Sequence, residues 1–236
     1  IPVNFTLGFS ARQNYLAARL SNPNYVNVFL GRLNAVVADN SAGSGEWVGE
    51  KVTLHTQSAL EEMRRDHSDV GSRLIAASIR NGDQVATLAG MDIHTMPPKA
   101  MKEFQESDRT PDQIKKTDGT TLNPNVDSTH EWSARVARLW EIDGDFRKAV
   151  DRLMARSDLD QLSGEDLVQF CNENGLDLFH PFSQQDLKKI QDDGKIPKLA
   201  DWSGAIALDD LMTHSALQSF SKDQNALDAR IKSFLK

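Results

Sequence analysis

Two glutamates four residues apart are the side chains in this sequence best suited to chemistry. Glu46 and Glu50 flank Trp47 and follow the glycine-rich stretch Gly43-Ser44-Gly45. Two carboxyl groups can divide the roles of general acid and general base when an apolar neighbour such as an indole keeps one of them protonated, as glycoside hydrolysis requires. The pair therefore predicts a hydrolase acting on a glycan or a peptide. The competing interpretation is two solvent-facing acids in a turn.

Other reactive arrangements are weaker or incomplete. Asp92 and His94 form a second possible dyad. His130 and the glutamate after it begin like a zinc-protease signature, but Ala134 stands where that motif needs its second histidine. Cys171 lies on an apolar helical face, which favours core packing over a nucleophilic role. Since no phosphate-cradling glycine-rich loop and no metal-ligand spacing occurs, the sequence predicts neither a cofactor nor a bound metal.

A short pattern recurs at a spacing of 20 residues, as Leu162 to Leu167 and again as Phe182 to Leu187. In each copy an apolar residue precedes serine and an acid follows three positions later, which predicts a capped helix start. Helical units with acids in their loops resemble the EF-hand. A loop beginning at Asp158 would place Ser163 where the calcium loop needs glycine, and Gln169 where it needs an acid. A degenerate, divalent-ion-responsive relative of the EF-hand is thus one alternative, with no metal ligands assigned.

Composition limits the class of protein. With 236 residues and 39% hydrophobic residues, the chain can bury a core as one large domain or two small ones. Its net charge of −7 argues against a nucleic-acid partner. No apolar run predicts a membrane span, and no segment resembles a signal peptide, although Ile1 in place of Met suggests a trimmed or processed chain. The single cysteine, Cys171, excludes an internal disulfide and fits a cytoplasmic protein or one exported without disulfides.

Hydrophobic periodicity predicts helices along most of the chain. Asn22-Pro23 has the form of a helix start, and the apolar residues from Val26 to Val37 then recur at intervals of three and four. A second apolar stripe runs from Leu60 to Leu74. The segment from Trp47 to Leu54 is the nearest approach to a strand. We therefore predict an all-α fold, a multi-helix orthogonal or bundle-like array of helical hairpins with a long irregular connection in the middle.

The same pattern predicts three regions. Residues 1–90 form an N-terminal helical subdomain and residues 91–127 an irregular connection, because prolines and an Asp-Gly pair interrupt that stretch. Residues 128–236 form a C-terminal helical subdomain that contains the repeated capped helix.

The missing catalytic signatures favour a non-catalytic protein that acts through its surface. The leading prediction is a helical protein-interaction module, either an exported bacterial effector involved in virulence or a secretion-associated factor, with a protein partner. Aromatic side chains dominate interface hot spots, so Trp202, Phe179 and Phe182 are the predicted anchors. The hydrolase using Glu46 and Glu50 and the EF-hand relative are the two alternatives.

Overall fold

A parallel β-sheet, which the sequence analysis did not predict, organises the N-terminal part of the molecule. The computed structural model describes residues 1–202 and 206–235. Within them, the sheet has four strands in the order β1-β2-β3-β4, and every neighbouring pair is parallel. The strands are β1 (Asn4–Phe5), β2 (Tyr25–Phe29), β3 (Arg73–Ala77) and β4 (Ile93–His94). The all-α prediction is therefore wrong.

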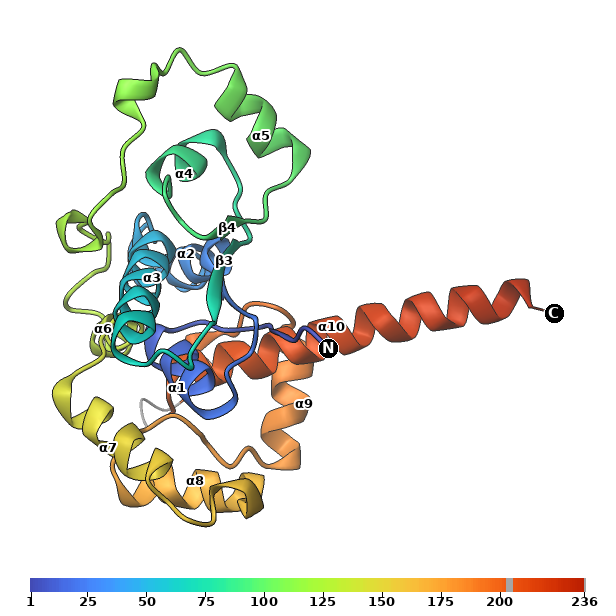
Figure 1. Cartoon of the computed structure of the whole chain (residues 1–236). Helices are drawn as coiled ribbons and strands as arrows, with labels where there is room; N and C mark the ends of the chain where they lie inside the picture. The colour runs from blue at the N-terminus through green and yellow to red at the C-terminus, as the bar shows by residue number, and fades with distance from the viewer. Residues whose placement is uncertain (203–205, 236) are drawn as a thin grey trace.

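Helices connect consecutive strands and continue after the last one (Figure 1). They are α1 (Ala11–Ser21), α2 (Leu30–Asp39), α3 (Val48–Asp66), α4 (Gly82–Thr87), α5 (Pro98–Gln105), α6 (Ser133–Ala137), α7 (Gly144–Met154), α8 (Gly164–Glu173), α9 (Gln184–Asp193) and α10 (Leu208–Phe234). Short 3-10 turns occupy Pro111–Gln113, Gly119–Thr121, Leu159–Gln161 and Leu199–Asp201. Each of the first three strands is thus followed by helix before the next strand begins, which is the repeating unit of parallel α/β folds.

The two faces of the sheet differ in burial. Val26 and Val28 of β2 are fully buried, and Leu74 and Ala76 lie opposite them in the register of β3 and are also fully buried. This face forms part of the hydrophobic core shared with α1 and α3. On the other face, Phe29 keeps part of its surface exposed at the end of its strand. Because functional groups in parallel α/β sheets gather at the carboxyl ends of the strands, that end is where a site is expected.

The missed strands have a physical explanation. In β2 the two valines, Val26 and Val28, alternate with the polar Asn27, and α2 begins at Leu30 directly after the strand. Together, the apolar residues of the strand and those of the helix that follows it have the spacing of one continuous helical stripe from Val26 to Val37. The second predicted stripe merged the end of α3 with Leu74 of β3. Conversely, the segment from Trp47 to Leu54, taken as the nearest approach to a strand, belongs to the start of α3.

The described residues after 128 form helices and 3-10 turns. Both repeated segments form the expected capping boxes, in which the Ser163 hydroxyl accepts from the backbone N–H of Asp166, and the Ser183 hydroxyl accepts from that of Asp186. The predicted division at residues 90 and 127 stays a prediction, although the helical character assigned to residues 1–90 is wrong because the strands lie mostly there. In the part of the chain that is described, no helix combines the length and apolar character needed to cross a bilayer.

A buried ion pair joins α1 to the start of α10. The Arg12 guanidinium donates through Nε and Nη2 to the two carboxylate oxygens of Asp209, at 2.8 Å each. The Ser10 hydroxyl donates to the same carboxylate at 2.6 Å. Desolvation lowers the pKa of Arg12, but the charge and hydrogen bonds of Asp209 outweigh it, so the pKa lies above its ordinary value. The contact fastens the C-terminal helix to the α/β part of the molecule.

The neighbouring carboxyl group, Asp210, gives the molecule a pH-dependent stability. Burial raises the pKa of Asp210 to about 7, against the opposing hydrogen bond that it accepts from the backbone N–H of His180. The folded chain therefore binds more protons than the unfolded chain between about pH 4 and pH 7, and this contribution to stability is lost as the pH rises through that range. The buried side chains of Arg12 and Asp209 and the partly exposed ring of His214 also face this carboxyl.

Replacing Asp210 with asparagine is expected to flatten this dependence. The amide oxygen can still accept the hydrogen bond from His180, but no charge forms on the side chain. Urea unfolding at about pH 5.5 and pH 8.5 should show a smaller loss of stability at the higher pH for Asp210→Asn than for the unsubstituted chain. Equal losses in the two proteins would show that Asp210 does not carry the effect.

Candidate functional site

Two arginines and a serine meet where β2 and β3 end. Arg32 lies in the first turn of α2, immediately after β2, and Ser78 and Arg80 follow the last residue of β3. We refer to Arg32, Ser78 and Arg80 as the arginine cluster. Since β2 and β3 are parallel neighbours, their carboxyl ends bring these residues to the same edge of the sheet.

Gly31 allows the close approach of the two chain segments. A Cβ atom built on Gly31 would lie 2.3 Å from the backbone oxygen of Ser78, 2.6 Å from Nε of Arg80 and 3.0 Å from the Ser78 hydroxyl. A residue with a side chain at this position would have to displace the backbone at Ser78, directly after β3. Ser78 itself has a φ of 65°, which a residue other than glycine rarely adopts. Such backbone conformations are concentrated at functional sites, where the surrounding structure maintains them.

Aromatic rings hold the Arg32 guanidinium in place. Its Cζ lies 5.6 Å from the centroid of the Phe29 ring and 5.4 Å from that of Phe220 on α10. The two rings contact each other edge to face, with centroids 6.2 Å apart. Arginine stacks well on aromatic faces while its N–H groups remain available at the edge of the plane. The rings therefore orient the guanidinium without using its hydrogen-bond donors.

The donors of the arginine cluster are not matched by acceptors. Nη1 of Arg32 is buried and has no hydrogen-bond partner within residues 1–202 and 206–235. In the same part of the chain, neither arginine of the cluster forms an ion pair, and the Ser78 hydroxyl makes no hydrogen bond. Desolvation lowers the pKa of Arg32, and the positive charge of Arg80 lowers it further, partly offset by Asp223.

This arrangement is suited to an anion with several oxygens. Two adjacent guanidinium groups repel each other, and an unpaired buried donor is costly, so the cluster carries a cost in the free protein. A phosphate group between the arginines would offset the repulsion between them and provide an acceptor for the unpaired donor, since phosphate is doubly charged and accepts several hydrogen bonds. The hydroxyl of Ser78 provides a further neutral donor beside it.

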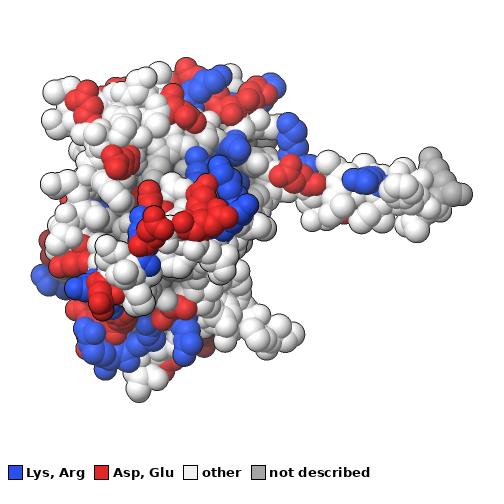
Figure 2. Space-filling model, turned by 90° about the horizontal axis from the view of Figure 1, so that it is seen from above, with Lys and Arg blue, Asp and Glu red and all other residues white. Residues whose placement is uncertain are grey.

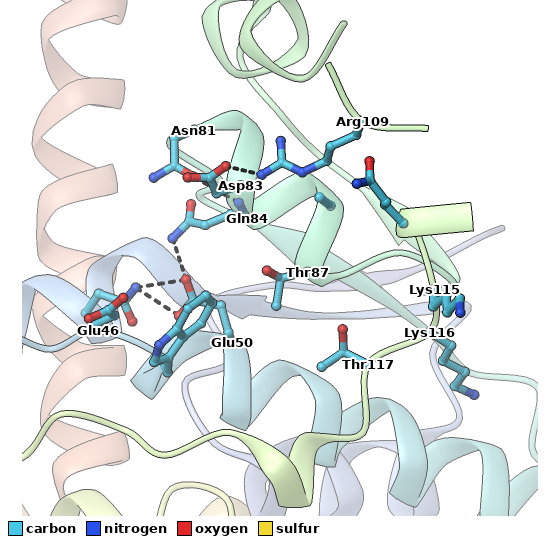
Figure 3. Close-up of a pocket in the computed structure, with 14 residues that line it drawn as sticks. Glu46, Glu50, Asn81, Asp83, Gln84, Thr87, Arg109, Lys115, Lys116 and Thr117 are labelled. Carbon is cyan, nitrogen blue, oxygen red and sulfur yellow. Dashed lines mark hydrogen bonds and ion pairs between the residues drawn. The ribbon is translucent and has the colours of Figure 1, made fainter. Parts of the chain in front are cut away.

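The predicted pair, Glu46 and Glu50, lies outside the arginine cluster. Both residues line a cavity of about 580 Å³ between α3, α4 and the chain around Lys115 (Figure 3). Glu46 is exposed, whereas Glu50 is 3% exposed. The carboxylate of Glu50 accepts from Nδ2 of Asn34 at 3.2 and 3.0 Å and from Nε2 of Gln84 at 2.8 Å.

These bonds connect helices α2, α3 and α4 through one buried side chain. Glu50 is therefore buried because its carboxylate holds these three helices together. Arg109 pairs with Asp83 on the opposite side of the cavity, as Figure 3 shows. No observation tests a catalytic role for Glu46 or Glu50, which stays a prediction.

The side chains of Asp92 and His94, the second possible dyad, each contact residues outside that dyad. Asp92 forms an ion pair with Arg64 at 3.2 Å and accepts a hydrogen bond from the backbone of Leu74. The His94 ring bonds through Nε2 to the backbone oxygen of Leu88 at 2.9 Å. These contacts fix β4 to its surroundings and provide a structural reason for both residues.

The predicted interface anchors are not freely exposed. Trp202 is 6% exposed, and Phe179 and Phe182 are partly buried against the core. The Phe182 ring contacts Trp202 edge to face at 5.9 Å. An interface role for these three residues stays a prediction, but the indole of Trp202 does not present a free surface.

Cys171 is buried, as expected for core packing, and burial raises the pKa of its thiol to about 11. The described residues contain no group of three or more His, Cys, Asp or Glu side chains that could hold a metal ion. The capped helices that resembled an EF-hand are therefore explained by their capping boxes.

Comparison with known proteins finds a family that covers this region. The model of the family described as transaldolase/fructose-6-phosphate aldolase matches residues 1–155. A probable transaldolase from Thermus thermophilus is 40% identical over 106 residues, which are 44% of this chain and 41% of that protein. A probable transaldolase from Lysinibacillus sphaericus is 34% identical over 106 residues, 44% of this chain and 42% of that protein. The chain thus spans about two fifths of the length of these relatives.

These matches overturn several predictions made from the sequence. They place the chain in a family of enzymes, so the prediction of a non-catalytic interaction module, with its hydrolase and EF-hand alternatives, is wrong. The associated predictions of virulence and secretion have no support. The four parallel strands in sequential order agree with the TIM-barrel α/β fold of the family.

Sequence reasoning missed the arginine cluster because it missed the strands. Arg32 and Arg80 each stand three residues beyond the last residue of an apolar strand, and Gly31 and Ser78 are among the residues between. Small residues followed by arginine at the ends of two neighbouring parallel strands would have indicated an anion site. Without the strands, the two arginines were single charges on predicted helices.

Proposed function

Since the chain belongs to the transaldolase/fructose-6-phosphate aldolase family, we propose that its arginine cluster binds the phosphate group of a phosphorylated sugar in an aldol-type reaction. The observation that carries this proposal is the buried, unpartnered Nη1 of Arg32 beside the charge of Arg80. TIM-barrel enzymes place their sites at the carboxyl ends of the strands and frequently bind phosphate there. The location of the cluster at the ends of β2 and β3 agrees with that rule.

The phosphate contact would position the sugar for chemistry at another carbon. In an aldol cleavage of a ketose, the bond between C3 and C4 breaks, the C4 hydroxyl loses its proton and becomes an aldehyde, and C3 gains a proton. Binding energy from a remote phosphate can be used to orient the reacting carbons. The arginine cluster serves this binding role.

The cluster does not itself activate a carbonyl group. A lysine amine can do so by forming a Schiff base with the substrate. The four strands described, and the three residues after each of them, contain no lysine. We therefore assign this chain the phosphate-binding contacts and assign no residue to carbonyl activation.

Calorimetric titration of the chain with fructose 6-phosphate, fructose and inorganic phosphate tests the proposal. We expect fructose 6-phosphate and inorganic phosphate to bind, fructose to show no measurable binding, and phosphate to compete with the sugar phosphate. Binding should weaken with added salt because the contact is between charges. Equal affinity for fructose and fructose 6-phosphate would refute phosphate recognition.

A further inference from the structure

The C-terminal half of α10 carries an apolar stripe that the rest of the described chain does not cover. Figure 1 shows this half of the helix leaving the body of the molecule. Leu227, Ile231 and Phe234 are 52%, 49% and 76% exposed. An isolated helix of this length gains little stability from its own hydrogen bonds, so an apolar stripe along it favours packing against another surface.

The stripe has the spacing of a coiled-coil seam. Successive members are separated by intervals of three and four residues: Leu217, Phe220, Gln224, Leu227, Ile231 and Phe234. In heptad notation Leu217, Gln224 and Ile231 occupy a positions, and the other three occupy d positions. The one polar member does not leave its amide unsatisfied, because Nε2 of Gln224 donates to Asp228 at 2.7 Å.

The charges beside the stripe distinguish between two ways of pairing it with a second copy. Asp223 and Arg230 both occupy g positions, and Asp228 occupies an e position. In an antiparallel pair the g positions of the two helices face each other, so Asp223 of each copy would meet Arg230 of the other. In a parallel pair g faces e, so Asp223 would meet Asp228 and two carboxylates would repel. The charge pattern thus complements an antiparallel copy of itself.

Antiparallel pairing also agrees with the shape of the molecule. Figure 2 shows the projecting helix as a mostly uncharged surface with separate charged residues. Pairing Leu217 with Phe234 of the second copy, and Phe220 with Ile231, would place the two bodies at opposite ends of a paired segment about 27 Å long. A parallel pair would place both bodies at the same end of the paired segment.

We propose that residues 217–234 of α10 form an antiparallel two-helix interface with a second copy of this chain. The seam consists of the six stripe residues, and two Asp223–Arg230 pairs flank it. The seam adjoins the arginine cluster through Phe220 and Asp223. Sedimentation measures association alone, so this proposal and the proposed function can fail separately.

Sedimentation velocity of the full chain over a range of about 1–500 μM tests this interface. The unsubstituted chain should pass from monomer to dimer as its concentration rises. Asp223→Arg or Arg230→Asp alone would bring two pairs of like charges together and should raise the dimer dissociation constant about tenfold. The double variant Asp223→Arg/Arg230→Asp restores opposite charges and should recover most of the affinity. Lys222→Glu, which lies outside the seam, is the matched control and should change it little.

Three results would overturn the proposal. The first is a chain that remains monomeric over the whole concentration range. The second is tighter association of Asp223→Arg, which would indicate the parallel arrangement. The third is a double variant that dimerises as weakly as the single variants. Circular dichroism of each variant verifies that α10 remains helical, so that a loss of dimer is attributable to the interface.

Discussion

Replacing Arg32 with alanine is expected to raise the dissociation constant for fructose 6-phosphate by about ten- to a hundredfold. Hydrogen bonds to charged groups contribute about 1.5–3 kcal/mol each, and Arg32 is the cation held in place by two aromatic rings. Arg32→Lys keeps the charge but loses the planar pair of donors, so it should fall between the alanine variant and the unsubstituted chain. Calorimetric titration measures all three.

The matched control is Lys115→Ala. Lys115 is a cation that lines the other cavity, beside Glu46 and Glu50. Its removal should leave the affinity for the sugar phosphate unchanged. If Lys115→Ala weakens binding and Arg32→Ala does not, the phosphate lies in the cavity of Figure 3, and the assignment to the arginine cluster is wrong.

Replacing Arg12 with leucine is expected to lower the free energy of unfolding by about 3–5 kcal/mol, because it leaves the Asp209 carboxylate buried without its cation. The side chains of Arg12 and Asp209 are 3% and 0% exposed, so water cannot replace the lost contact. Urea unfolding followed by circular dichroism measures the change.

Two comparisons make this result specific to the buried pair. Arg156→Ala removes an exposed arginine that pairs with Asp158 and should change stability little, since exposed pairs are screened by solvent. The double variant Arg12→Leu/Asp209→Leu removes both charges and should recover much of the loss. If Arg12→Leu is no less stable than Arg156→Ala, the pair does not fasten α10 to α1.

The sequence predicted those parts of the fold in which local signals act alone. The capping boxes at Ser163 and Ser183 depend on residues three positions apart, and both form as expected. The burial of Cys171 followed from its helical face. The strands could not be predicted in this way, because β1 and β4 are two residues long and β2 runs directly into α2. The sheet forms through pairing between residues that are distant in the sequence, such as Val26 and Leu74, and a local sequence pattern does not predict such pairing.

The candidate site depended on the same long-range pairing. Arg32 and Arg80 are far apart in sequence and become neighbours only because β2 and β3 are parallel and Gly31 lets their ends approach. The predicted pair of Glu46 and Glu50 did reach a cavity, since both lie at the start of α3 or just before it. The chemistry predicted for this pair depended only on the spacing of the two glutamates. The hydrogen bonds that Glu50 accepts come from Asn34 and Gln84, which lie on two other helices.

A crystal structure of the chain soaked with fructose 6-phosphate tests the central claim most directly. We expect the phosphate group between Arg32 and Arg80, with its oxygens about 3 Å from the guanidinium nitrogens and the Ser78 hydroxyl. A sugar phosphate bound elsewhere, with the arginine cluster empty at full occupancy of the ligand, would contradict it.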